Sequence, residues 1–249
     1  MIPTAAIARS RPTPDARVGL GGRKTPAGRV RAGRSLVRFA DARALVQAVR
    51  AGRVGAGVRG ALPAGTFVRA LGAEAASVQR GVLLEPRPGR GVVLGPVGVT
   101  EGRSGGARAR FAQEAAALLL RAGLLTEDPL IAVMAAGRAE DASRGAPVAR
   151  SLAQGEEVAR RLERQGLDAF PAGVLLEDVI HDADIVVAPD GATGNLLFRA
   201  LHLVGGVPSY GALCAGTRLT LVDTSRARTS YERPVRLAAF LAAAAARGH

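Results

Sequence analysis

Short apolar segments alternate with longer amphipathic stretches through most of the chain. Four to eight apolar residues bounded by turn residues indicate buried strands, and apolar positions with a period near 3.6 indicate helices. Because alternating strands and helices form βα units, the pattern predicts an α/β fold with a mostly parallel sheet. The predicted strands are 54–58, 81–85, 91–94, 130–134, 185–188 and 219–222, and the predicted helices are 63–71, 104–121, 151–165, 174–181, 194–204 and 231–246.

One pair of strands changes the expected topology. The segments 81–85 and 91–94 are separated by the turn sequence Pro86-Arg-Pro-Gly89, which is short enough for a hairpin. A mixed sheet is therefore expected. With 249 residues the chain is long for one domain and short for two, so we predict one α/β unit over residues 1–249, with room for two lobes.

Positive charge is concentrated near the start of the sequence. The formal net charge is +13, and residues 1–60 hold thirteen basic and two acidic side chains. Such a segment can bind nucleic acid, or it can reflect an arginine-rich composition without a partner. Arginine occurs throughout, lysine occurs once, and no Trp is available for base stacking, so nucleic acid is the less favoured partner. The sequence also allows residues 1–15 to form a flexible basic leader.

The remaining composition limits the chemistry. The single cysteine, Cys214, forms no internal disulfide, and the three histidines share no metal-binding spacing. We therefore expect a cytoplasmic protein without a metal. No apolar run reaches the roughly 18 residues that a membrane span needs, so no membrane association is expected.

The segment 184–204 predicts a strand, a tight turn and a helix. Asp190 and Gly191 form the turn, and Gly194 is expected near the helix start, where Thr193 and Asn195 offer polar side chains. Ligands of open α/β sheets bind beyond the carboxyl ends of strands, where helix N-termini present free N–H groups, so this turn is suited to an anion. Asn195 is the only asparagine in the chain. An ordinary helix cap explains the local pattern equally well.

A second strand, 219–222, is followed directly by Asp223, Thr224, Ser225 and Arg226. The planar guanidinium of an arginine can hold two oxygens of a phosphate or carboxylate. If both strands are neighbours, the two turns face one crevice and form one anion site. A loop closed by its own Asx and Ser/Thr hydrogen bonds is the alternative.

Two further glycine-rich segments are weaker signals. Gly102-Arg-Ser-Gly-Gly106 precedes a helix and allows a second anion at Arg103 and Ser104, although a plain helix entry is favoured. The stretch 18–24 resembles a dinucleotide fingerprint but lacks the third glycine at the required spacing.

Together, the motifs Asp190-Gly-Ala-Thr-Gly-Asn195, Tyr210-Gly-Ala-Leu213 and Asp223-Thr-Ser-Arg226 resemble those of the phosphate acetyl/butyryltransferase and PlsX superfamily. The chain is more similar still to an archaeal branch called MtxX, or methanogen marker protein four, which is named as a methyltransferase subunit. That resemblance includes Val58-Arg-Gly-Ala-Leu-Pro63, the stretches 94–102, 137–145 and 148–153, and covers residues 54–249. It implies an isocitrate/isopropylmalate-dehydrogenase-like α/β fold.

The resemblance also implies a function and a set of site residues. The expected function is that of an MtxX-like transferase, of the methyltransferase or phosphate acyltransferase type, acting on a small anionic substrate. The substrate-binding residues would be Asp190, Gly191, Thr193, Gly194, Asn195, Asp223, Thr224 and Arg226, with Ser225 orienting the anion and Glu232 as general base. The cofactor is left open, with a CoA ester allowed, and a homodimer or a methyl-transfer complex is the expected assembly.

Two alternatives from other classes remain. Ala136-Gly-Arg-Ala-Glu-Asp141 stands where phosphotransacetylases have a serine-rich turn, which allows a non-catalytic ligand-binding or scaffold subunit of a methyl-transfer complex. The other alternative is a nucleic-acid-associated protein that acts through its basic N-terminal segment.

Overall fold

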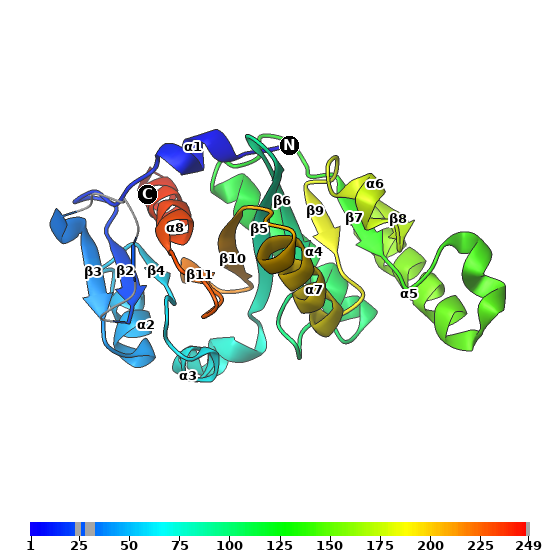
Figure 1. The fold of residues 1–249 in the computed structure, drawn as a ribbon, viewed down its shortest axis with the longest axis horizontal. Helices are drawn as coiled ribbons and strands as arrows, with labels where there is room; N and C mark the ends of the chain where they lie inside the picture. The colour runs from blue at the N-terminus through cyan, green and yellow to red at the C-terminus, as the bar shows by residue number, and fades with distance from the viewer. Residues whose placement is uncertain (23–25, 28–32, 248–249) are drawn as a thin grey trace. The chain divides into compact units, whose positions relative to one another are not determined.

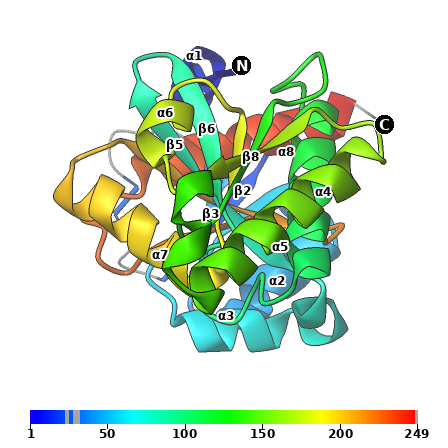
Figure 2. The ribbon, with the colours of Figure 1, turned by 90° about the vertical axis from the view of Figure 1, so that its right-hand side faces the viewer.

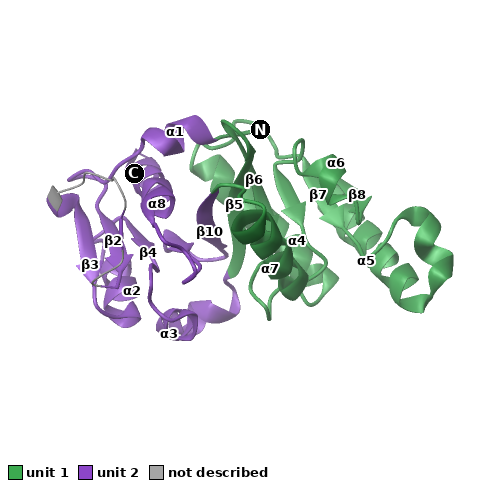
Figure 3. Ribbon diagram, in the orientation of Figure 1, with its two compact units in different colours: residues 1–3, 79–208 green, residues 4–78, 209–249 purple. Residues whose placement is uncertain are grey.

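The computed structural model describes residues 1–22, 26–27 and 33–247 (Figure 1). The chain divides into two compact units (Figure 3): unit 1 comprises residues 1–3 and 79–208, and unit 2 comprises residues 4–78 and 209–249. The basic residues Arg23, Lys24, Arg29 and Arg31 lie outside the described residues.

Unit 1 is an α/β unit with a mixed arrangement of strands. Its strands are β1 (Ile2–Pro3), β5 (Gln79–Arg87), β6 (Arg90–Gly95), β7 (Ile131–Met134), β8 (Ala169–Gly173) and β9 (Ile185–Val187). Its helices are α4 (Gly105–Arg121), η3 (Ala139–Arg144), α5 (Ala146–Glu163), α6 (Leu176–Val179), α7 (Gly191–Phe198) and the π-helical η4 (Arg199–Val204).

The strands of unit 1 are arranged in the order β5-β6-β9-β7-β8. The hairpin β5–β6 is antiparallel and the remaining pairs of this series are parallel, which confirms the predicted mixed topology. Helices α4 and α5 lie side by side over the strands (Figure 2). Because β6, β9, β7 and β8 run in one direction, the loops that follow them all leave from one edge of the sheet.

Unit 2 is built in the same way from its own segments. Its strands are β2 (Val18–Gly21), β3 (Leu36–Phe39), β4 (Ala56–Val58), β10 (Ser209–Ala215) and β11 (Leu221–Asp223). Its helices are α1 (Thr4–Arg9), η1 (Gly33–Ser35), α2 (Ala42–Arg50), α3 (Ala64–Ala70), η2 (Gly72–Ala76) and α8 (Glu232–Arg247).

In unit 2 the strand order is β3-β2-β4-β11-β10, and only the β11–β10 pair is antiparallel. Asp41 caps α2 by accepting a hydrogen bond from the Ala44 N–H at 2.8 Å. The apolar face of α2, with Leu45, Val46 and Val49, packs into a core cluster with Phe67. Because the short strands β2 and β4 carry few large side chains of their own, packing against α2 stabilises them.

Most predicted elements of residues 54–249 are present. The bounds differ at three helices: α5 begins at Ala146 rather than 151, α6 is limited to Leu176–Val179 rather than 174–181, and α7 begins at Gly191 rather than 194 and is followed by the π-helical η4 from Arg199. Strands β8 and β10 were not predicted. Residues 1–15, which the sequence allowed as a flexible leader, contain β1 and α1, and both Ile2 and Ile7 are fully buried. Within the described residues, no helix is long and apolar enough to cross a membrane.

Candidate functional site

In unit 1 the turn after β9 is closed by its own carboxylate. Asp190 is the N-cap of α7, where its Oδ1 accepts a hydrogen bond from the Thr193 N–H at 2.8 Å. Its Oδ2 accepts a second hydrogen bond from the Thr193 hydroxyl at 3.2 Å. A cap at Asp190 explains why the helix begins three residues earlier than the pattern of apolar residues predicts.

The absence of side chains at the two glycines of this turn leaves room for the loop that follows β6. A Cβ on Gly191 would lie 1.7 Å from the carbonyl oxygen of Gly98, and a Cβ on Gly194 would lie 2.1 Å from that of Pro96. The Gly191 N–H donates to the Glu101 carbonyl at 3.0 Å. The close backbone approach that we expected for an anion is thus made by the loop that follows β6.

Asn195 also holds this loop. It lies inside α7 rather than at its start, and its side-chain amide donates to the Val97 carbonyl at 3.0 Å. The loop itself is fixed by Glu101, which accepts hydrogen bonds from the Arg80 Nε at 2.7 Å and the Arg80 N–H at 2.8 Å. Two motifs that are far apart in the sequence, 94–102 and 190–195, therefore form one structural element.

The same region of unit 1 contains a cation that the sequence analysis missed. Arg108, in the first turns of α4, is 1% exposed, and its Nε is buried without a hydrogen-bond partner. No hydrogen bond or ion pair joins its guanidinium to another residue of the described chain. Burial lowers the pKa of this guanidinium, and the charge of the Asp190 carboxylate acts in the opposite direction.

A sequence signal for Arg108 exists. The residue lies on the apolar stripe of α4 with Phe111, Ala112, Ala115 and Leu119, each of which is buried. A charged residue at a core position of an amphipathic helix is rare unless it has a partner. The glycine-rich segment 102–106 drew attention to Arg103 instead, which is exposed.

In unit 2 the motif after β11 is closed by an ion pair. Asp223 Oδ1 accepts a hydrogen bond from the Nε of Arg59, and the exposed fractions of these side chains are 9% and 5%. Arg59 also donates to the Leu62 carbonyl. The Thr224 hydroxyl donates to the Gly60 carbonyl at 2.9 Å. Asp223 and Thr224 thus join the segment 58–63 to β11, the second pair of distant motifs that the fold brings together.

The next residues of this motif are more open. The Ser225 hydroxyl accepts a hydrogen bond from the Ala227 N–H at 3.2 Å, which is a local turn contact. Arg226 is exposed, and its guanidinium contacts no hydrogen-bond or ion-pair partner among the described residues. Arg226 is therefore the member of the motif that has donors available for a ligand.

Two further arginines surround this motif in unit 2. Arg228 donates to the Ser209 carbonyl at 2.7 Å, and burial, together with the nearby charge of Arg233, lowers its pKa to about 10. The guanidinium carbon of Arg233 lies 5.0 Å from the ring centroid of Tyr210, in a cation–π contact. These positive charges make the surroundings of Arg226 electrostatically suited to an anion.

Glu232, the expected general base, is the first residue of α8. Its Oε1 accepts two hydrogen bonds from Arg236, at 2.9 and 3.2 Å. Arg236 in turn donates to the Ala8 carbonyl at 2.6 Å and links α1 to α8. In this arrangement the carboxylate of Glu232 belongs to a helix-terminal ion pair.

The site residues thus fall into two groups. Asp190 to Asn195 lie in unit 1, and Asp223 to Arg226 and Glu232 lie in unit 2. The expectation that both turns serve one ligand stays a prediction. Among the described residues, no group of three or more His, Cys, Asp or Glu side chains could hold a metal ion.

Known structures define the class of fold. A branched-chain phosphotransacylase from Enterococcus faecalis superposes with a TM-score of 0.62 at 20% identity, covering 83% of this chain and 82% of that one. A 4-hydroxythreonine-4-phosphate dehydrogenase from Klebsiella pneumoniae superposes with a TM-score of 0.55 at 15% identity, covering 92% and 84%. The fold is the isocitrate/isopropylmalate-dehydrogenase-like α/β fold.

Sequence relatives define the family. A Methanopyrus kandleri protein named "uncharacterized methyltransferase" is 41% identical over 207 residues, which is 80% of each chain. A Methanosarcina barkeri protein named methyltransferase mtx subunit X is 36% identical over 148 residues, and the match spans about half of that protein, 54% of its length. The chain belongs to this MtxX family. No model of a known protein family matches it.

Proposed function

We propose that the chain is a transferase, or the ligand-binding subunit of one, that binds a substrate carrying a phosphate or carboxylate group. The observation that carries this proposal is Arg108, whose buried guanidinium has no partner in the described chain. An unpaired buried ion costs several kcal/mol, so such a residue is retained where a ligand completes its pairing. A phosphate or carboxylate supplies the two oxygens that a guanidinium binds best.

The surroundings of Arg108 support this assignment. It lies in the first turns of α4, beyond the carboxyl end of β6, and the Asp190 turn follows β9 at the same edge of unit 1. Ligands of open α/β sheets bind at this edge. The names of two proteins with this fold, a phosphotransacylase and a 4-hydroxythreonine-4-phosphate dehydrogenase, also refer to phosphate-bearing substrates.

In unit 2 we assign Arg226 to the same substrate class. Its free guanidinium and the neighbouring Arg228 and Arg233 favour an anion. Direct group transfer between two bound substrates would then depend on preorganised donors, with Ser225 orienting the anion. Glu232 could act as general base after it separates from Arg236. A CoA ester as co-substrate and a cytoplasmic location belong to the same proposal.

A non-catalytic subunit is the second candidate. The ion pair of Glu232 with Arg236 favours it, since an engaged carboxylate at a helix start is a poor proton acceptor. The names of the Methanosarcina relatives describe a subunit, and we propose a methyl-transfer complex or a homodimer as the assembly. Under both candidates the anion site is the same.

A thermal-shift screen tests the proposal. The purified chain would be heated with inorganic phosphate, acyl phosphates, CoA esters, pterin methyl donors and S-adenosylmethionine. We expect phosphate-bearing compounds to raise Tm, because a ligand that binds the folded state stabilises it. Absence of any shift with the phosphate-bearing compounds contradicts the proposal, and turnover of a stabilising compound separates the transferase from the idle subunit.

Two variants assign the roles in unit 2. Arg226→Lys keeps the charge and loses the planar pair of donors, so affinity should fall about tenfold to a hundredfold. In an active transferase Glu232→Gln should lower kcat about a hundredfold with little change in ligand affinity. In an idle subunit this second variant leaves ligand affinity unchanged, and no turnover is present.

A further inference from the structure

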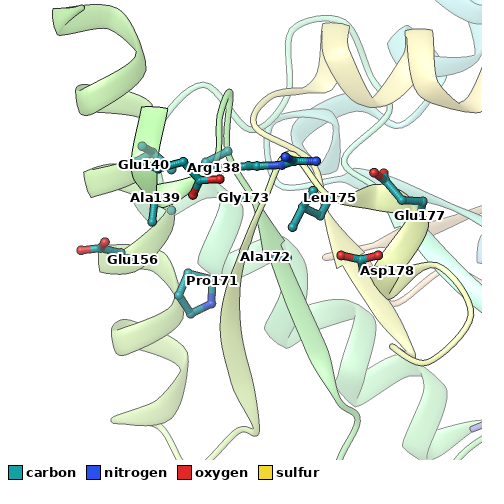
Figure 4. A pocket seen from close by; sticks show the side chains of 13 residues that line it. Arg138, Ala139, Glu140, Glu156, Pro171, Ala172, Gly173, Leu175, Glu177 and Asp178 are labelled. Carbon is teal, nitrogen blue, oxygen red and sulfur yellow. The ribbon is translucent and has the colours of Figure 1, made fainter. Parts of the chain in front are cut away.

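Unit 1 contains a cavity that the proposed function does not use. Its volume is about 600 Å³, and it lies beyond the carboxyl ends of β7 and β8, between η3, α5 and α6 (Figure 4). Ala135, Leu152, Pro171 and Leu175 give it an apolar lining. Pockets for small organic molecules have volumes of roughly 300–1,000 Å³, so this cavity has the size of a ligand site.

The charges around this cavity are opposite to those of the protein as a whole. Glu140 and Glu156 line one side, Glu177 and Asp178 on α6 line the other, and Arg138 is the one basic residue among the lining side chains (Figure 4). The carboxylates therefore exceed the guanidinium by three charges, in a chain with a net charge of +13.

These carboxylates lack the arginine partners that are frequent elsewhere. None of the four has a side-chain hydrogen bond or ion pair within the described part of the chain. By contrast, Asp141, next to Glu140 in the sequence, pairs with Arg144 at 3.0 Å and accepts the Arg138 N–H at 2.9 Å. All four carboxylates are exposed, and together with Arg138 they leave an excess of three negative charges around the cavity.

The walls of the cavity are fixed by backbone contacts. The Ala135 N–H donates to the Gly173 carbonyl at 2.7 Å. A Cβ on Gly173, which has a φ of +57°, would lie 2.7 Å from the Gly137 carbonyl oxygen. The segment 137–145, which carries part of the family resemblance, thus packs directly on the end of β8. A preformed cavity binds its ligand without the cost of ordering a loop.

We propose that this cavity is a binding site for a small organic cation, an amine, guanidine or sulfonium group attached to an apolar body. The carboxylates attract the positive group, and the apolar lining accepts the body of the molecule. Phosphate-rich ligands are repelled by the same carboxylates. The Arg138 side chain extends across the cavity toward α6, where it weakens the attraction for a cation (Figure 4).

Calorimetry at low ionic strength tests the proposal with three cationic probes: agmatine, spermidine and S-adenosylmethionine. We expect at least one of them to bind, with coenzyme A as the anionic comparison. The double variant Glu177→Gln/Asp178→Asn should weaken that binding about tenfold, because it removes two of the facing charges. Arg138→Gln should strengthen it about threefold, because it removes a repulsive charge.

The matched control is Glu127→Gln/Glu163→Gln. It removes the same net charge from exposed residues of unit 1 that do not line the cavity, and should leave affinity for the probe unchanged. Equal weakening in both double variants would show nonspecific attraction to surface carboxylates and overturn the site. Absence of binding by all three probes would overturn it as well. Neither result changes the expected binding of phosphate at Arg108, so a failure of the proposed cation site can be distinguished from a failure of the proposed function.

Discussion

Arg59 and Arg108 are both buried near strand ends, yet their surroundings differ completely. Arg59, in unit 2, pairs with Asp223 and also donates to the Leu62 carbonyl. Arg108, in unit 1, is 1% exposed and its Nε has no partner. Burial of a charge therefore does not by itself identify its role. A paired buried arginine fixes the fold, whereas an unpaired one is suited to a ligand.

The strongest test of the structural arginine is its removal. Arg59→Met removes the cation that pairs with the buried Asp223 carboxylate, so we expect a loss of about 3–5 kcal/mol in the free energy of unfolding. Urea denaturation followed by circular dichroism measures this loss. The double variant Arg59→Met/Asp223→Leu should recover part of it. A loss below about 1 kcal/mol in the single variant would mean that the pair is unimportant for stability.

The next largest effect concerns the turn near Arg108. Gly191→Ala places a Cβ 1.7 Å from the Gly98 carbonyl oxygen, so the loop must move and we expect a loss of about 1–3 kcal/mol. Gly65→Ala is the control, since a Cβ at this helical position meets only the Arg69 Nη1, at 3.4 Å. That control should stabilise the protein by up to about 1 kcal/mol. Similar melting temperatures of both variants would contradict the packing role of Gly191.

A smaller loss of stability is expected when a hydrogen bond near Arg59 is removed and the Arg59–Asp223 ion pair is kept. Thr224→Val removes the donor to the Gly60 carbonyl and keeps the shape of the side chain. We expect a loss of about 1–2 kcal/mol, which is less than that of Arg59→Met, because a neutral hydrogen bond is exchanged for an unsatisfied carbonyl. Urea denaturation of both variants under the same conditions measures the two losses of stability. A larger loss in Thr224→Val than in Arg59→Met would contradict the greater weight of the ion pair.

The smallest effect is expected for an exposed ion pair. Arg50 and Glu74 lie 2.8 Å apart with side chains 48% and 31% exposed, so Glu74→Gln should cost less than about 1 kcal/mol near neutral pH. The Thr217 hydroxyl and then Arg50 lower the pKa of Glu74. Because the pKa of Glu74 is lower in the folded protein than in the unfolded chain, where it is about 4.3, the charged carboxylate stabilises the fold above about pH 4.3. This contribution disappears as the pH falls through the pKa of the folded protein. The difference between Glu74→Gln and the parent should therefore shrink on acidification, and growth of that difference would contradict the sign.

The sequence predicted the α/β class and most elements of residues 54–249, because long apolar stripes and glycine boundaries define them. Within this range it missed β8 and β10, and it predicted no element for residues 1–53, where β2 lies. β2 has two glycines among four residues, β8 contains Pro171, and β10 consists mostly of small residues, so none has the β-branched character of a typical strand. Only tertiary packing against neighbouring strands and helices makes them strands.

The sequence predicted where the site motifs lie in the fold, whereas their binding and catalytic roles stay predictions. The turns at 190–195 and 223–226 are both at strand ends, as expected. The sequence could not show that Gly191, Gly194 and Asn195 hold the loop after β6, or that Asp223 pairs with Arg59, since these contacts join residues about 100 to 160 positions apart. Arg108 was missed because the glycine-rich segment 102–106 directed the prediction to Arg103, although a charge on the apolar stripe of a helix is a signal.

Whether Arg108 binds the substrate anion is measured by calorimetric titration of the parent chain, Arg108→Met and Arg110→Met with inorganic phosphate. Arg110 is exposed on the same helix and loses the same charge. We predict that Arg108→Met lowers phosphate affinity more than about tenfold and, without phosphate, melts at or above the temperature of the parent, because an unpaired buried charge is replaced by an apolar side chain. Arg110→Met should match the parent in both respects. Unchanged phosphate affinity in Arg108→Met, or a large loss of stability without ligand, would contradict the account.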